Sequence, residues 1–395
     1  MNVATPKRLV TPAFVALSAA TLAFFIAGGL VLPIAPQFVK VAIGADSVGV
    51  GVAIGAFSVA ALLLRPVVGW SSDRFGRRPL LVGGSLLTVA ALLAHLVATD
   101  LPLFIGARAL LGAGEGFYFV AALAAGSDLA PEERRGEALN FLSLSLYLGV
   151  AIGPPIAEFL FAQGSYPVVW LAAAGFAVAA VVLSWLVPET APAVLDRSEG
   201  HRPRAPLIHP AGLFPGFIIL LGLWGMAGFL TYLPLYARTV GLDGAGPPLT
   251  AYALIVVGLR VVGARWPDRF GAARLSSTAL IVSAAGLTVI GLAPTPIGLM
   301  FGTAVFASGV AFTMPALLSL AVSRVPPEER GTVVGTATVF LDVAFGFAPV
   351  VLGLIADRAG YGSTFLVSAA VATLAGLLLV ARRASMQERL AVAGE

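Results

Sequence analysis

The sequence predicts an all-helical integral membrane protein in which twelve spans form two similar six-helix bundles. Three observations predict this class: scarce charge, long unbroken apolar runs, and a polar motif that recurs about half a chain later. Only 11% of the 395 residues are charged, and 58% are apolar, whereas a typical soluble domain has roughly 25% charged residues. The mean hydropathy is +0.96. A soluble fold could not cover that much apolar surface, whereas a bilayer requires it.

The apolar runs have the length of helices rather than of barrel strands. They reach the ~20 residues that a spanning helix needs and lack the alternation of ~10-residue barrel strands. The polar stretch 189–210 divides them, so we expect an N-terminal bundle over 1–188, a cytoplasmic linker over 189–210 and a C-terminal bundle over 211–395. The expected spans are residues 12–37, 47–70, 79–98, 101–124, 137–162, 166–187, 211–237, 245–267, 275–293, 296–322, 333–356 and 362–383.

The distribution of lysine and arginine supports this count and predicts the orientation. Of the 24 basic residues, the loops on one side hold only Lys40, Arg238 and Arg358. Four more lie within spans (Arg65, Arg108, Arg260 and Arg265), and the remaining 17 lie on the alternate loops that include the N-terminus. The positive-inside rule therefore predicts that both termini are cytoplasmic.

A polar motif between the second and third expected spans, Gly69–Arg78, recurs at residues 260–271 with an offset of 195. A second repeat relates residues 131–136 to residues 327–331, with the two glycines again 195 apart. These repeats indicate an internal duplication. The residues that match in the first repeat are Asp73, Arg74, Phe75 and Gly76 with Asp268, Arg269, Phe270 and Gly271.

The first copy of the motif resembles the signature loop between helices 2 and 3 of major facilitator superfamily (MFS) transporters, through Gly69, Asp73, Arg74, Gly76, Arg77 and Arg78. Glu189 and Thr190 resemble the family's ending of helix 6, and Arg108 and Gly112 resemble its helix-4 motif, although Leu111 replaces the usual polar residue. Gly149, Gly153 and Pro154 resemble the helix-5 motif of the 12-helix drug:proton antiporters, although Ala157 and Glu158 replace the glycine pair that ends it.

The resemblance implies that the motif loop is a conformational latch, formed by Gly69, Asp73, Arg74, Gly76, Arg77 and Arg78, with Asp268 and Arg269 in the second copy. Asp73 ends an expected helix, where an anion can face the positive N-terminal end of a neighbouring helix. The alternative is a topology signal with solvated charges. In the second copy alanines 272 and 273 replace the arginine pair, so we expect a weaker latch there.

Charged residues within spans are the best site candidates, because each is costly in hydrocarbon and usually faces a cavity or a partner. The candidates among them are Arg108, Glu115, Glu158 and Asp342. We expect Arg108 to pair with Glu158, while Glu115 or Asp342 takes and releases a coupling proton. Burial disfavours an ionised carboxylate and a nearby arginine favours it, so a rocking bundle could load and unload the proton. The alternative for the pair is a static ion pair between helices.

Aromatic residues at similar depth are candidates for the substrate cavity: Phe25, Tyr118, Tyr147, Trp224, Tyr232 and Phe340. Most membrane aromatics are packing residues or interface anchors, which is the alternative for each of them. The glycines and proline of the helix-5 motif would allow close packing or bending of that helix.

The resemblance implies a secondary transporter that works by alternating access. We expect proton-coupled efflux, by antiport, of small lipophilic or cationic compounds such as drugs. A permease or exporter of a polar metabolite, such as a sugar or organic acid, is the alternative. The expected location is a bacterial cytoplasmic membrane, because two lysines against 22 arginines is typical of a GC-rich bacterial genome.

Several other functions find no support in the sequence. A Gly-x4-Gly-Lys-Ser/Thr loop is absent, so we expect the proton gradient rather than ATP to supply energy. There are no cysteines and three scattered histidines, so we expect neither cofactor nor metal. We expect no enzyme activity, because no nucleophile–base pair is visible. The expected partners are a small-molecule substrate, protons and the lipid bilayer, with no nucleic acid, and a monomer suffices.

Overall fold

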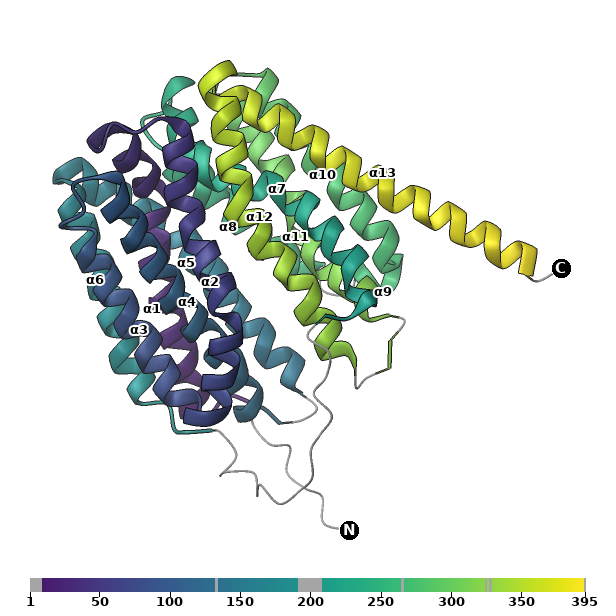
Figure 1. Cartoon of the computed structure of the whole chain (residues 1–395), viewed down its shortest axis with the longest axis horizontal. Coiled ribbons are helices and arrows are strands. Elements are labelled where there is room, and N and C mark those ends of the chain that lie inside the picture. The colour runs from purple at the N-terminus through teal and green to yellow at the C-terminus, as the bar shows by residue number, and fades with distance from the viewer. Residues whose placement is uncertain are drawn as a thin grey trace, which may run out of the picture. The chain divides into compact units, whose positions relative to one another are not determined.

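The computed structural model of this chain consists of helices joined by short connections (Figure 1). It describes residues 9–131, 134–190, 208–263, 266–323, 325–326 and 329–393, with the side chains of 69, 73, 136, 140, 267, 268, 331 and 383–393 left out. No strand occurs in these ranges. The elements are α1 (Pro12–Gln37), η1 (Phe38–Ala42), α2 (Ser47–Phe75), α3 (Arg77–Ala94), α4 (Leu101–Leu129), α5 (Arg135–Gln163), α6 (Tyr166–Trp185), α7 (Pro210–Thr239), α8 (Gly246–Val262), α9 (Trp266–Phe270), α10 (Ala272–Leu292), α11 (Pro296–Val322), α12 (Arg330–Ala359) and α13 (Tyr361–Ala393).

Local signals explain where several helices begin. The Thr11 hydroxyl accepts a hydrogen bond from the Phe14 amide (3.2 Å), and Pro12 occupies the first position of α1. The Asp100 carboxylate accepts from the Leu103 amide (2.9 Å) at the start of α4, and the Thr295 hydroxyl does the same for α11. Such side chains satisfy amides that the first helical turn leaves without partners.

Eleven helices of the described chain are long and apolar enough to cross a membrane. The remaining expected span, 245–267, is the shorter α8, which ends at Val262 because Gly263 closes its last turn. The separate helix α9 then begins at Trp266. The all-helical membrane fold predicted from composition is confirmed, with a break in the eighth expected span.

The chain divides into two compact units that repeat one packing scheme. Unit 1 comprises Met1–Phe38 with Ala56–Arg202, and unit 2 comprises Val39–Gly55 with Pro203–Glu395. In unit 1, α1 packs on α5 and α6, and α3 packs on α4 and α6. In unit 2, α7 packs on α12 and α13, and α10 packs on α11 and α13. The same pairings in both units are what the sequence repeat predicts.

Glycines allow the helices to approach through their backbones. A Cβ on Gly84 of α3 would lie 2.6 Å from the Tyr118 nitrogen of α4, and one on Gly114 would lie 2.9 Å from the Gly84 oxygen. Unit 2 repeats this contact, where Gly286 of α10 lies against Phe306 and Gly302 of α11. Small residues at helix interfaces are the usual means of close packing in membranes, because burying apolar surface does not favour helix association in lipid.

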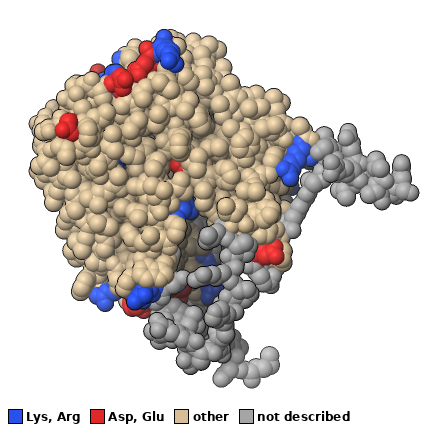
Figure 2. Space-filling model, viewed as in Figure 1, with Lys and Arg blue, Asp and Glu red and all other residues tan. Residues whose placement is uncertain are grey.

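The outer surface is apolar, as a membrane protein requires. Ile297 is 81% exposed, and Leu63 and Val97 are each at least 70% exposed. On the face drawn in Figure 2, charged side chains gather mainly at opposite edges, and broad uncharged areas lie between them. Exposed aliphatic side chains between charged ends are expected where lipid is the solvent.

Candidate functional site

The motif loop of unit 1 is built around a glycine and a remote carboxylate. Gly76 separates α2 from α3 with φ +93°, a left-handed conformation that glycine adopts without strain. The Glu189 carboxylate, which follows α6, accepts hydrogen bonds from the amides of Arg77 (2.8 Å) and Arg78 (3.2 Å). Glu189 therefore caps the N-terminus of α3, where a negative charge is favoured.

The Arg77 side chain ties α3 to the ends of two other helices. Its Nη1 donates to the carbonyl and the hydroxyl of Ser72 on α2 (2.8 Å each), and its Nε lies 3.3 Å from Oδ2 of Asp128 at the end of α4. The same Asp128 oxygen accepts from the Thr190 hydroxyl (3.2 Å). This polar network links the ends of four helices within unit 1.

The other arginines of the motif lie over aromatic rings. The Arg74 guanidinium is 5.1 Å from the centre of the Trp70 ring, and that of Arg78 is 4.8 Å from the Trp185 ring. Gly69 and Asp73 lie outside the described side chains, so the interaction of Asp73 with a neighbouring helix stays a prediction, as does the latch as a whole.

The second copy keeps the turn but changes its surroundings. Gly271 has φ +82°, close to that of Gly76, and stands between α9 and α10. A Cβ on Gly271 would meet no atom within 4 Å, whereas one on Gly76 would lie 2.5 Å from the Glu189 carboxylate. Arg269 lies over Phe270 (5.6 Å), and the Asp268 side chain is outside the described part. The turn is duplicated, while among the described side chains only the first copy packs against a capping acid.

Arg108 is buried in α4 and faces α2 rather than α5. It is 7% exposed, and its guanidinium lies 5.1 Å from the centre of the Phe57 ring. Gly112, one turn later on the same helix face, packs against the Phe57 backbone. The ion pair expected between Arg108 and Glu158 is not formed among the described residues, because this face of α4 contacts α2.

The three carboxylates within spans lie on separate helices. Glu115 is on α4, Glu158 on α5 and Asp342 on α12, and each interacts with neighbouring residues. Asp342 is the most buried of them, at 7% exposure. Their roles in proton coupling stay predictions.

The helix-5 motif forms the contact between α1 and α5. A Cβ on Gly149 would lie 2.5 Å from the Phe25 Cβ, and one on Gly153 would lie 2.5 Å from the Gly29 Cα. Pro154 lies within α5 directly after these glycines. The motif residues therefore let two helix backbones touch.

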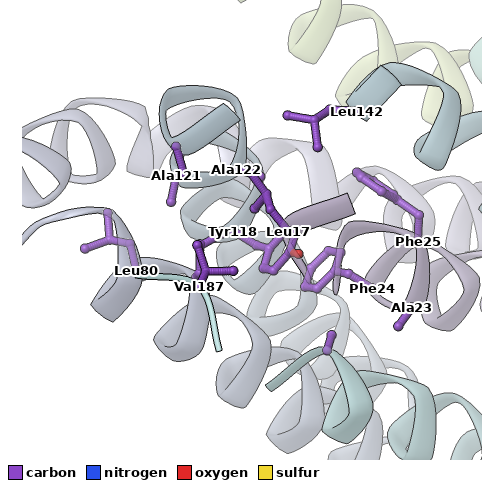
Figure 3. Close-up of a cluster of buried hydrophobic side chains, with 13 residues drawn as sticks. Leu17, Ala23, Phe24, Phe25, Leu80, Tyr118, Ala121, Ala122, Leu142 and Val187 are labelled. Atoms are coloured by element: carbon purple, nitrogen blue, oxygen red, sulfur yellow. The ribbon is translucent and has the colours of Figure 1, made fainter. Parts of the chain in front are cut away.

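The aromatic candidates differ in burial. Tyr118 has no exposed surface and stacks on Phe24 with ring centres 3.9 Å apart, in the apolar core of unit 1 shown in Figure 3. Phe25 belongs to the same core. Tyr232 is also fully buried, whereas the remaining candidates Tyr147, Trp224 and Phe340 are half-buried. Tyr118 therefore has a packing role in this conformation.

Replacing Tyr118 by phenylalanine tests that role. The Tyr118 and Thr21 hydroxyls lie 3.3 Å apart, so the variant loses one buried hydrogen bond. We expect the free energy of unfolding to fall by about 1 kcal/mol, measured by thermal unfolding in detergent, with substrate affinity unchanged. A stable variant with altered substrate affinity would instead assign Tyr118 to the substrate site.

Three carboxylate contacts were not expected from the sequence. Asp128 accepts from the Arg77 side chain, and Glu189 accepts from the Arg77 amide. Asp357 accepts from two amides at the start of α2. Glu189 had a signal in the motif that ends helix 6. Asp128 and Asp357 had only their position near a helix end as a signal.

Two units of long apolar helices with repeated pairings and intramembrane charges define a multi-pass membrane carrier. A profile of the Major Facilitator Superfamily matches residues 17–259 and 244–394. An uncharacterized MFS-type transporter of Salmonella typhimurium is 30% identical over 372 residues, covering 91% of this chain and 93% of that protein. The chain belongs to the major facilitator superfamily, and it is a secondary transporter of a small molecule.

Solved structures share the fold at low sequence identity. The inward-open xylose transporter XylE from E. coli matches with a TM-score of 0.75 and 17% identity, covering 93% of this chain and 94% of that one. The human organic anion transporter MFSD10 matches with a TM-score of 0.72 and 20% identity, covering 95% and 100%. These likenesses concern the fold alone.

Proposed function

We propose that the protein exports small lipophilic or cationic compounds in exchange for protons across a bacterial cytoplasmic membrane. The proposal rests mainly on the position and burial of Asp342. This residue lies in α12, about 18 Å along the helix axis from Arg330, and is 7% exposed. A carboxylate so deep in a spanning helix is costly as an isolated charge, so its interactions with neighbouring residues, a proton or a bound cation must stabilise it. Exchange of a proton for a cationic substrate alternates between the last two.

Two further features support export of apolar cations. The interior offers aromatic side chains that are half-buried, such as Trp224 and Phe340, and the spans hold three carboxylates. Aromatic faces attract cations and also accept apolar surface. The helix-5 motif that resembles those of drug:proton antiporters makes the α1–α5 contact.

Arg108 favours a second candidate, transport of an organic acid. Its guanidinium is buried over Phe57, and its Nε has no hydrogen-bond partner among the described residues. A buried guanidinium can hold a carboxylate through two parallel hydrogen bonds. The structural neighbour named an organic anion transporter shares the fold.

Proton release from the purified protein distinguishes the two candidates. We expect tetraphenylphosphonium to release protons from the wild type, because a cation that enters the site displaces the carboxyl proton. Among Glu115→Gln, Glu158→Gln and Asp342→Asn, we expect Asp342→Asn to reduce the release at least tenfold. A pH-sensitive dye in weakly buffered detergent solution measures the release.

Asp243→Asn is the control, because Asp243 is an exposed carboxylate in the connection after α7. We expect it to release protons as the wild type does. If no cation releases protons, while benzoate binds to the wild type and not to Arg108→Ala, the organic-acid candidate replaces the first. Uptake of the active compound into everted vesicles that carry an imposed proton gradient tests the direction.

A further inference from the structure

The first part of α2 is attached to α12 by a remote carboxylate. The amides of Ser47 and Val48 donate to the two carboxylate oxygens of Asp357, at 2.9 Å and 3.3 Å. Asp357 lies near the C-terminal end of α12, 310 residues from Ser47. A negative charge stabilises the first turn of a helix, so this bond fixes the start of α2 to another element of unit 2.

A buried tyrosine hydroxyl holds the same helix end from a third element. Tyr232 of α7 has no exposed surface, and its hydroxyl donates to the Ser47 carbonyl (3.0 Å) and also contacts the Pro349 carbonyl of α12. The ring thus fastens the first turn of α2 to α7 and α12. A buried hydroxyl needs such acceptors, because leaving it without one is costly.

Glycines bring the two backbones together along the whole segment. A Cβ on Gly51 would lie 2.6 Å from the Pro349 carbonyl carbon, and one on Gly353 would lie 2.5 Å from the Ser47 oxygen. Gly55 packs in the same way against Gly346. Two turns of α2 therefore lie against α12 with no side chain between them.

These contacts place Val39–Gly55 in unit 2, while the rest of α2, from Ala56, belongs to unit 1. The helix is continuous through both units, yet the sequence assigns all of it to the first six-helix half. Any motion that separates the halves at this end must therefore break the contacts of Ser47–Gly55 or bend α2.

We propose that Asp357, Tyr232 and the contact of Gly51 and Gly55 with α12 form a latch, the α2–α12 latch, which opens each time the carrier exposes its substrate site on this side of the membrane. The predicted topology makes this the outer side. The motif loop lies at the other end of the same helix, where Glu189 caps the following helix, α3. This inference rests on membership of the carrier family and needs no particular substrate or coupling ion.

Spin labels on the cysteine-free chain test the latch directly. Val97→Cys and Asp243→Cys place one label after α3 and one after α7, in exposed connections at the same end of the helices as Ser47. Pulsed electron paramagnetic resonance in liposomes gives the distance distribution between the labels. We expect Asp357→Asn and Tyr232→Phe each to raise the ratio of long-distance to short-distance populations about fivefold. A change of this size corresponds to the loss of one hydrogen bond. Without substrate, this readout does not depend on the proposed export.

Two matched controls separate the latch from local effects. Asp46 caps the same helix from its own chain neighbourhood, accepting from the Gly49 amide at 2.7 Å. Tyr236 donates to the Ile290 carbonyl of α10 at 2.8 Å, an acceptor that is not part of α2. We expect Asp46→Asn and Tyr236→Phe to leave the distances unchanged. Unchanged distances in folded Tyr232→Phe and Asp357→Asn, or equal shifts in the controls, would overturn the latch.

Discussion

Replacing Gly29 by alanine is expected to destabilise the protein by about 3 kcal/mol, whereas the same change at the neighbouring Gly28 is expected to be tolerated. A Cβ on Gly29 would overlap the Gly149 carbonyl oxygen and lie 3.2 Å from the Gly153 Cα. These are backbone atoms of α5, so no side chain can move aside and the helices must separate. A Cβ on Gly28 would meet nothing within 4 Å.

The expected changes in the free energy of unfolding have opposite signs for Gly29→Ala and Gly28→Ala. Overpacked sites typically lose 1–3 kcal/mol, and a clash with a helix backbone belongs at or above that limit, about 3 kcal/mol. Alanine in an open helical position gains up to about 1 kcal/mol over glycine from helix propensity. Thermal unfolding and the monodisperse fraction on size exclusion, both in detergent, measure the two variants. Equal losses at the two positions would contradict the contact between α1 and α5.

The helices could be predicted from the sequence because their signals are local. The expected first span, 12–37, agrees with α1, since Thr11 and Pro12 mark its start. The repeat offset predicted two alike units, and the pairings of α1 with α5 and of α7 with α12 agree with it. The eighth span was predicted too long, because an apolar run does not show that Gly263 ends the helix.

The candidate sites were predictable only in part, because their partners are remote in the chain. Arg77 was recognised through its motif, but its partner Asp128 lies 51 residues away on another helix. Asp357 meets Ser47 across 310 residues, and no local pattern encodes that contact. Arg108 was expected to pair with Glu158 on depth alone, and depth does not determine which neighbour a helix face meets.

Replacing Gly76 by alanine is expected to destabilise the protein by about 2–4 kcal/mol, more than the same change at Gly271. Both glycines have positive φ, and the left-handed conformation costs alanine about 1–2 kcal/mol. Only at Gly76 does the new methyl group also displace the Glu189 carboxylate, which lies 2.5 Å from the Cβ position. The amides of Arg77 and Arg78 then lose their acceptor, which adds about 1–2 kcal/mol.

The double variant Gly76→Ala with Glu189→Ala separates strain from capping. Glu189→Ala alone removes the acceptor of the two amides and should cost about 1 kcal/mol. Because it also empties the space that the methyl group needs, the two changes together should cost less than the sum of their separate costs. Hydrogen exchange of the peptide around residues 72–82 reports the same coupling, since the Arg77 and Arg78 amides are protected only while Glu189 binds them. Additive costs would show that Glu189 does not cap α3. Less than additive costs, with Gly271→Ala unaffected by the loss of Glu189, would show that the acid distinguishes the first copy of the loop from the second.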